Sequence, residues 1–200
     1  HPLALARFGL NAMRSAKGLA EARFQGRAAR ALFVGMAGHS MLRLESRLTA
    51  AFGLVLGISA HAVGWPIPRG GSQRISDALA SYFKSIGGEI DTGVSVESIE
   101  ELPPARAVLF DVGPRQLARI ANKRLPDRFR RALERYRYGA GVFKIDWALN
   151  APIPWRATEC ERAGTVHLGG TMDETVASEG VVLDGQHPEA PFVLLAQQSL

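Results

Sequence analysis

The sequence is poor in cysteine and in long apolar runs, two features that define whole classes of protein. Its single cysteine, Cys160, excludes an internal disulfide and is compatible with a reducing compartment. The most apolar stretch, residues 48–63, includes Ser59 and His61 and falls short of the roughly 20 apolar residues that a membrane span requires. We therefore expect a buried helix here and a cytoplasmic protein, with peripheral membrane attachment left open.

Recognisable catalytic, metal-binding and targeting motifs are also missing. The five histidines are scattered without metal-ligand spacing, and Cys160 has no neighbouring partner. Ser40 and Ser59 lack the G-x-S-x-G elbow of the α/β hydrolases. We therefore assign no catalytic residue and no metal ligand. No signal peptide is visible, and the chain starts at His1 rather than at Met, so we expect a piece of a longer protein.

The composition is that of an ordinary folded protein. The 200 residues are 46% hydrophobic and 22% charged, which excludes a disordered chain and allows one or two domains with a real core. The net charge of +5 permits an acidic partner, cofactor phosphates or an anionic surface, but requires none of them.

A cluster of arginines is the strongest sign of a nucleic-acid or membrane surface. Its members are Arg124, Arg128, Arg130, Arg131, Arg135 and Arg137. However, Asp127 lies four residues before Arg131, and Glu134 lies four after Arg130, which favours a solvated, self-paired helix face. Phe129, Leu133 and Tyr136 share the inward face of the expected helix, so aromatic residues that could stack on bases beside the arginines are missing. We therefore predict no nucleic-acid partner.

The most informative stretch runs from Trp65 to Ile99. A stiff arm, Pro66–Pro68, leads into Gly70-Gly71, after which Ser72 can cap a helix. Apolar residues at helical spacing give this helix one apolar face: Ile75, Leu79, Tyr82, Phe83 and Ile86.

Gly87-Gly88 is expected to end this helix, because glycine adopts the left-handed conformation without steric cost. Ile90, Val94 and Val96 then predict short extended segments. We expect the apolar face of the helix to pack on strands around Val96 and Val108.

Around this unit the patterns predict mainly helices before it and strands after it. Helices are expected at 3–15, at 23–38, after a Ser46 cap, near Leu117, after Pro126 and at 173–180; strands are expected at 107–110, 142–149, 165–168 and 192–196. The predicted class is α+β: an α/β slice of an FAD/NAD(P)-binding domain, a helical cap and an antiparallel substrate-domain sheet. The predicted domains are 1–63, 64–122 and 123–200.

The central stretch resembles a known family. The pattern G-W-P-x-P-x-G-G, then x-A-L-x-x-x-F, then G-G-x-I-x-T-x-x-x-V-x-x-I, is similar to the middle of the phytoene-desaturase-like FAD-dependent oxidoreductases, within the superfamily of carotenoid desaturases and amine oxidases. The resemblance covers about residues 46–99. The N-terminal G-x-G-x-x-G fingerprint of these enzymes and their C-terminal FAD segment are absent from this sequence.

The resemblance implies candidate site residues. Val96 matches the valine whose backbone pairs with the adenine edge of FAD, although a plain core valine would look the same. Gly70 and Gly71 match the glycines at the passage from the substrate domain to the FAD domain, although a simple turn would look the same. The segment near flavin and substrate corresponds to Trp65, Pro66 and Pro68, and the predicted substrate pocket also includes Trp147.

The expected function is therefore that of the substrate-binding middle region of an FAD-dependent oxidoreductase acting on an apolar small molecule. FAD would be bound by the complete protein and not retained by this chain alone, and the rest of the same polypeptide would be its partner. The flavin would carry the hydride, which suits the lack of acid–base motifs. Two alternatives stay open: a non-catalytic helical domain binding an apolar ligand or protein partner, and a flavin-dependent isomerase.

Overall fold

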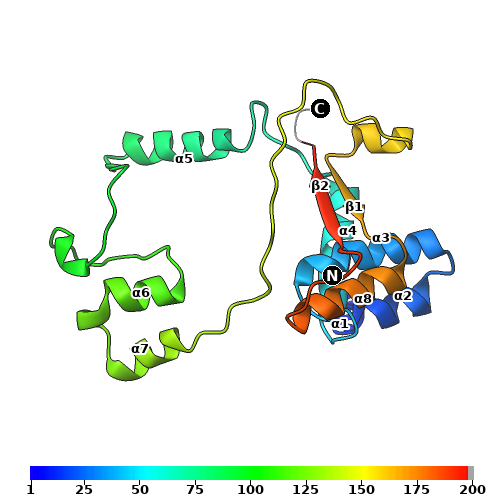
Figure 1. Cartoon of the computed structure of the whole chain (residues 1–200), viewed down its shortest axis with the longest axis horizontal. Helices are drawn as coiled ribbons and strands as arrows, with labels where there is room; N and C mark the ends of the chain where they lie inside the picture. The colour runs from blue at the N-terminus through cyan, green and yellow to red at the C-terminus, as the bar shows by residue number, and fades with distance from the viewer. Residues whose placement is uncertain (198–200) are drawn as a thin grey trace. The chain divides into compact units, whose positions relative to one another are not determined.

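The computed structural model describes residues 1–197 and has an α+β fold with two compact units. The first unit consists of residues 1–75 and 140–197, and the second of residues 76–139 (Figure 1). The predicted domain boundaries after residues 63 and 122 stay a prediction.

The α-helices and β-strands have the following bounds. They are α1 (Pro2–Ala12), α2 (Ala16–Arg23), α3 (Arg27–Ala37), α4 (Thr49–Ala62), α5 (Gln73–Ser85), α6 (Pro114–Ile120), α7 (Asp127–Glu134), β1 (Thr165–Leu168), α8 (Met172–Leu183) and β2 (Val193–Ala196).

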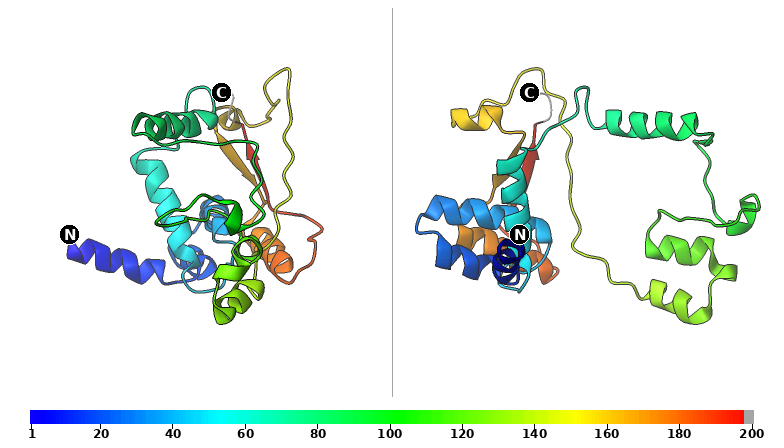
Figure 2. Two further views of the ribbon diagram at one scale, coloured as in Figure 1. Left: turned by 90° about the vertical axis from the view of Figure 1, so that its left-hand side faces the viewer. Right: turned by 180° about the vertical axis from the view of Figure 1, so that it is seen from behind.

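The core of the first unit is built around α3, which packs against α2, α4 and α8 (Figure 2). Its apolar residues recur at helical spacing, so that Phe33, Val34 and Ala37 are all buried. The buried cluster consists of Ala16, Leu19, Ala20, Phe33, Val34, Ala37, Leu44, Ala50, Met172 and Val176. Several of these side chains are alanines, which let the helices approach closely.

The sheet of the first unit pairs β1 with β2 in antiparallel register, Thr165 opposite Ala196 and Leu168 opposite Val193. The predicted strands at 165–168 and 192–196 are therefore confirmed. The predicted helix at 173–180 is also confirmed, and it begins at an N-cap where Thr171 Oγ1 accepts from the backbone N–H of Glu174.

Two other predicted strands are wrong. Residues 107–110 and 142–149 contain no strand, and the segments around Ile90, Val94 and Val96 carry none either. Phe143 is 90% exposed. Alternating apolar residues form a strand only where another strand supplies hydrogen bonds, and the sheet found in residues 1–197 pairs only β1 with β2. The predicted α/β slice is therefore not formed.

Helix α4 differs from its prediction in its start and in its burial. It begins at Thr49, after Leu48 in a left-handed conformation with φ of 73°, and is not capped by Ser46. Its buried residues are Thr49, Ala50 and Gly53, whereas Phe52 and Ile58 are exposed. Only one side of α4 meets α3, and the expectation of burial on all sides is therefore wrong.

Helix α5 ends where its glycines predict. The backbone N–H of Gly87 donates to the Lys84 carbonyl and that of Gly88 to the Phe83 carbonyl, both at 3.0 Å, with Gly87 at φ of 90°. These two bonds form a Schellman motif, which satisfies carbonyl groups left free at the helix end.

The apolar face of α5 has no buried residue, and Leu79 is 65% exposed. The expected packing on strands around Val96 and Val108 is therefore wrong, because those strands do not form. On α7, the predicted Arg130–Glu134 ion pair is present at 2.9 Å, and Asp127 pairs with Arg130 rather than with Arg131.

Candidate functional site

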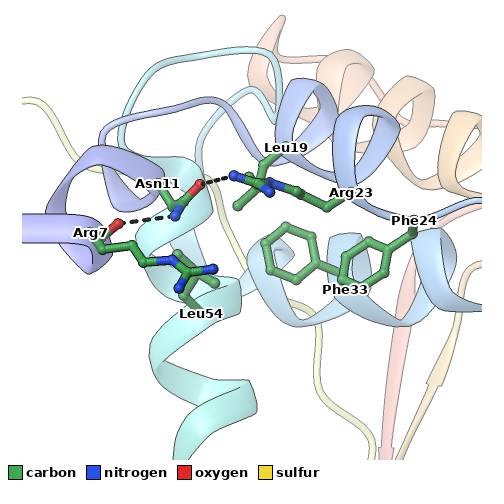
Figure 3. Close-up of a pocket in the computed structure, with 7 residues that line it drawn as sticks. All are labelled: Arg7, Asn11, Leu19, Arg23, Phe24, Phe33 and Leu54. Carbon is green, nitrogen blue, oxygen red and sulfur yellow. Dashed lines mark hydrogen bonds between the residues drawn. The ribbon is translucent and has the colours of Figure 1, made fainter. Parts of the chain in front are cut away.

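The first unit contains an open hollow of about 230 Å³ between helices α1 to α4 (Figure 3). Four apolar side chains and three polar ones line it: Leu19, Phe24, Phe33, Leu54, Arg7, Asn11 and Arg23. Because the lining residues come from four consecutive helices and one connection, the hollow exists only when these helices are packed together.

Close contact between α3 and α4 shapes the floor of the hollow. A Cβ atom at Gly53 would lie 2.9 Å from Cε2 of Phe33 and 3.1 Å from the Phe33 carbonyl oxygen. Glycine at this position therefore lets the Phe33 ring rest on the α4 backbone. The Phe33 and Phe24 rings lie 5.6 Å apart between centroids and are tilted by 46°, which gives the hollow an aromatic wall.

The polar residues form a connected rim (Figure 3). Asn11 Nδ2 donates to the backbone carbonyl of Arg7 at 3.0 Å, and Arg23 donates to Asn11 Oδ1 at 3.5 Å. Arg7 and Asn11 are four residues apart on α1 and so face the same way. In the part of the chain that the structure describes, neither Arg7 nor Arg23 forms an ion pair with a carboxylate.

Sequence reasoning missed this rim. The spacing of Arg7 and Asn11 was the only local signal, and such a pair is common on solvated helix faces. Arg23 belongs to another helix, so nothing in the sequence indicates that its side chain lies beside Asn11.

A second polar cluster joins the strand β1 to the end of α3. His39 Nε2 and His167 Nε2 lie 3.4 Å apart, and the Phe192 ring packs edge-on against His167. Burial lowers the pKa of His167, and the nearby His39 lowers it further. Within residues 1–197 no three His, Cys, Asp or Glu side chains come together as a set of metal ligands.

The predicted site residues Trp65, Pro66, Pro68, Gly70 and Gly71 form one continuous arm between α4 and α5. Trp65 is 61% exposed, Pro66 is exposed and Pro68 is half-buried. Gly70 and Gly71 have φ of 86° and 88°, and the Gly71 N–H donates to the Pro68 carbonyl at 2.9 Å. None of these residues lines the hollow.

The two remaining predicted residues lie elsewhere. Val96 is half-buried in irregular backbone of the second unit, not in the strand predicted for it. Trp147 belongs to the first unit and is 69% exposed in the segment where a strand was predicted. Trp147, like Trp65 and the two prolines, does not line the hollow, and the substrate pocket assigned to these four residues stays a prediction.

Comparison with protein-family models, with curated proteins and with solved structures finds no match in any of the three. None of the helices within residues 1–197 combines the length and the apolar character that crossing a membrane demands.

Proposed function

We propose that this chain is the substrate-binding middle region of an FAD-dependent oxidoreductase that acts on an apolar small molecule. The observation that carries the proposal is the unit between Trp65 and Gly88. It joins a proline-stiffened arm, two successive left-handed glycines and an amphipathic helix with a glycine-terminated end. This is the part of the sequence that resembles the phytoene-desaturase-like enzymes.

The geometry at Gly71 supports a backbone role beside a cofactor. A Cβ atom built there would meet nothing within 4 Å, so the space beside the backbone is open. A side chain at this position would fill that space, whereas glycine leaves the backbone accessible to a planar ligand. In the complete enzyme we place the flavin on this side of the arm.

The exposed apolar face of α5 supports the proposal that another part of the same polypeptide packs against it. Ile75, Leu79, Tyr82 and Phe83 on α5 are all exposed, and so is Ile86, which follows the helix. An exposed apolar row of this length marks a contact surface. The remaining part of the FAD domain would cover it and would supply the pyrophosphate-binding turn that this sequence lacks.

The hollow between helices α1 to α4 supports the proposal that the substrate is apolar. Its apolar lining consists of Leu19, Phe24, Phe33 and Leu54, and it is open to a ligand. It equally suits the alternative of a non-catalytic binding domain. The two functions separate on the complete gene product, where only the enzyme holds a flavin that an oxidisable substrate bleaches.

Substitution of Gly71 by valine in the complete gene product tests the proposal. Valine is strained at a φ of 88°, but it has space, so the fold should survive while flavin per folded molecule falls or flavin reduction slows. Gly185→Val is the matched control, because Gly185 has φ of 76° and equally open surroundings beyond the end of α8.

The readouts are the flavin-to-protein absorbance ratio, the rate of flavin bleaching and the melting temperature. We expect flavin loss in Gly71→Val only, with similar small losses of stability in both variants. Normal flavin content and normal turnover in Gly71→Val would leave Gly70 and Gly71 as plain turn residues and refute this site assignment.

A further inference from the structure

The rim of the hollow carries charge that an apolar substrate alone would not use. Arg7 and Arg23 both line the hollow, and no carboxylate of residues 1–197 forms an ion pair with either of them. By contrast, Arg43 pairs with Asp184, and Arg130 pairs with two carboxylates. The hollow is thus bordered by two arginines that form no ion pair within the part of the chain that the structure describes.

Asn11 contacts the backbone of Arg7 and the side chain of Arg23. Its amide nitrogen is bound to the Arg7 carbonyl, and its amide oxygen accepts from the Arg23 guanidinium. Arg23 has further N–H donors, and the guanidinium of Arg7 is not used in these bonds. A planar guanidinium offers paired donors that match the two oxygens of a carboxylate.

The size of the hollow limits the apolar part of the ligand. Its volume of about 230 Å³ lies below the roughly 300–1,000 Å³ of pockets that enclose a drug-sized molecule. The wall of Leu19, Phe24, Phe33 and Leu54 can therefore cover a short acyl chain or one end of a longer one, and not a long rigid polyene.

We propose that this hollow binds an amphipathic carboxylate, with its acyl chain against Phe24, Phe33 and Leu54 and its carboxylate between Arg7 and Arg23. The inference rests on the proposed function in that it names the substrate class of that function: an apolar molecule that ends in a carboxylate. Charge complementarity at the rim selects the acid over the corresponding alcohol or amine.

Octanoate is a suitable probe, because it can be used as a monomer and has a matched alcohol and amine. Isothermal titration of the 200-residue chain should show saturable binding of octanoate and weaker binding of octanol, octylamine and acetate. Acetate lacks the acyl chain and octanol lacks the charge, so each isolates one half of the site.

The double variant Arg7→Gln, Arg23→Gln should lower the affinity for octanoate roughly tenfold, as expected for two partly exposed charge pairs, and should leave octanol binding unchanged. The control Arg47→Gln, Arg128→Gln removes the same charge at two exposed positions outside the hollow and should keep the octanoate affinity. All four arginines are exposed, and circular dichroism checks that both double variants are folded.

Equal affinity for octanol and octanoate, or an equal loss in the two double variants, would overturn the proposal. Binding to vesicles containing anionic lipid without saturable binding of octanoate would also overturn it, and would make the rim a membrane-contact surface. These measurements need no flavin. Their failure therefore leaves the Gly71 test standing, and a failure of the Gly71 test leaves octanoate binding as evidence for a non-catalytic binding domain.

Discussion

Thr49→Val should destabilise the first unit although it barely changes the side-chain volume. Thr49 is fully buried at the start of α4, and its Oγ1 accepts from the backbone N–H of Ala16 at 2.9 Å. The same hydroxyl donates to the Ser46 carbonyl at 2.7 Å. Ala16 is the first residue of α2, so the hydroxyl satisfies a donor that the helix itself cannot.

The other donors of that turn are already paired. The N–H of Lys17 donates to the Leu44 carbonyl, and that of Gly18 donates to Ser15 Oγ. Valine would leave the Ala16 N–H buried without an acceptor, because Ala16 is fully buried. A buried unsatisfied donor costs about 1–3 kcal/mol, so we expect a loss of about 2 kcal/mol. In a chain of this size that corresponds to roughly 4–8 °C in melting temperature.

Urea unfolding followed by far-ultraviolet circular dichroism measures this loss. Thr49→Ser is the matched control, because it keeps the hydroxyl and removes only a methyl group. This variant should therefore retain most of the stability that Thr49→Val loses. If Thr49→Val and the wild-type chain unfold within about 0.5 kcal/mol of each other, or if Thr49→Ser is the less stable variant, the hydrogen bond to Ala16 does not hold α2 to α4.

Two further predictions concern His167 and Leu79. The lowered pKa of His167 means that the unfolded chain binds its proton more readily, so stability should fall as pH drops below 6.5 and level off below the folded pKa; His167→Asn should weaken this slope in urea midpoints measured across that range. Leu79→Ala should change the unfolding free energy of this chain by at most about 0.5 kcal/mol, because Leu79 is 65% exposed. A loss of about 2–5 kcal/mol, typical of an emptied core site, would show that α5 is packed.

Local signals in the sequence were enough for several elements. The end of α5 just before Gly87 followed from the two glycines, because the hydrogen bonds of a helix end join residues only a few positions apart. The positions of strands β1 and β2 were also predicted from the sequence, and the two strands pair with each other in an antiparallel sheet. The same pattern at 142–149 failed, because a strand requires a partner that local sequence does not name.

The amino-acid sequence by itself therefore indicated the helices α3, α5 and α8, with α3 starting four residues later than predicted, and the turn at Gly70-Gly71. Propensity, spacing and glycine conformation act over a single turn of chain. Only the tertiary structure decided which apolar faces are covered. It buried the hydroxyl of Thr49, at the start of α4, against the first residue of α2, and it left α5 exposed. It also brought Arg7, Asn11 and Arg23 together around an apolar hollow. These outcomes depend on contacts between residues far apart in the chain, and a periodic pattern specifies a face without specifying its partner.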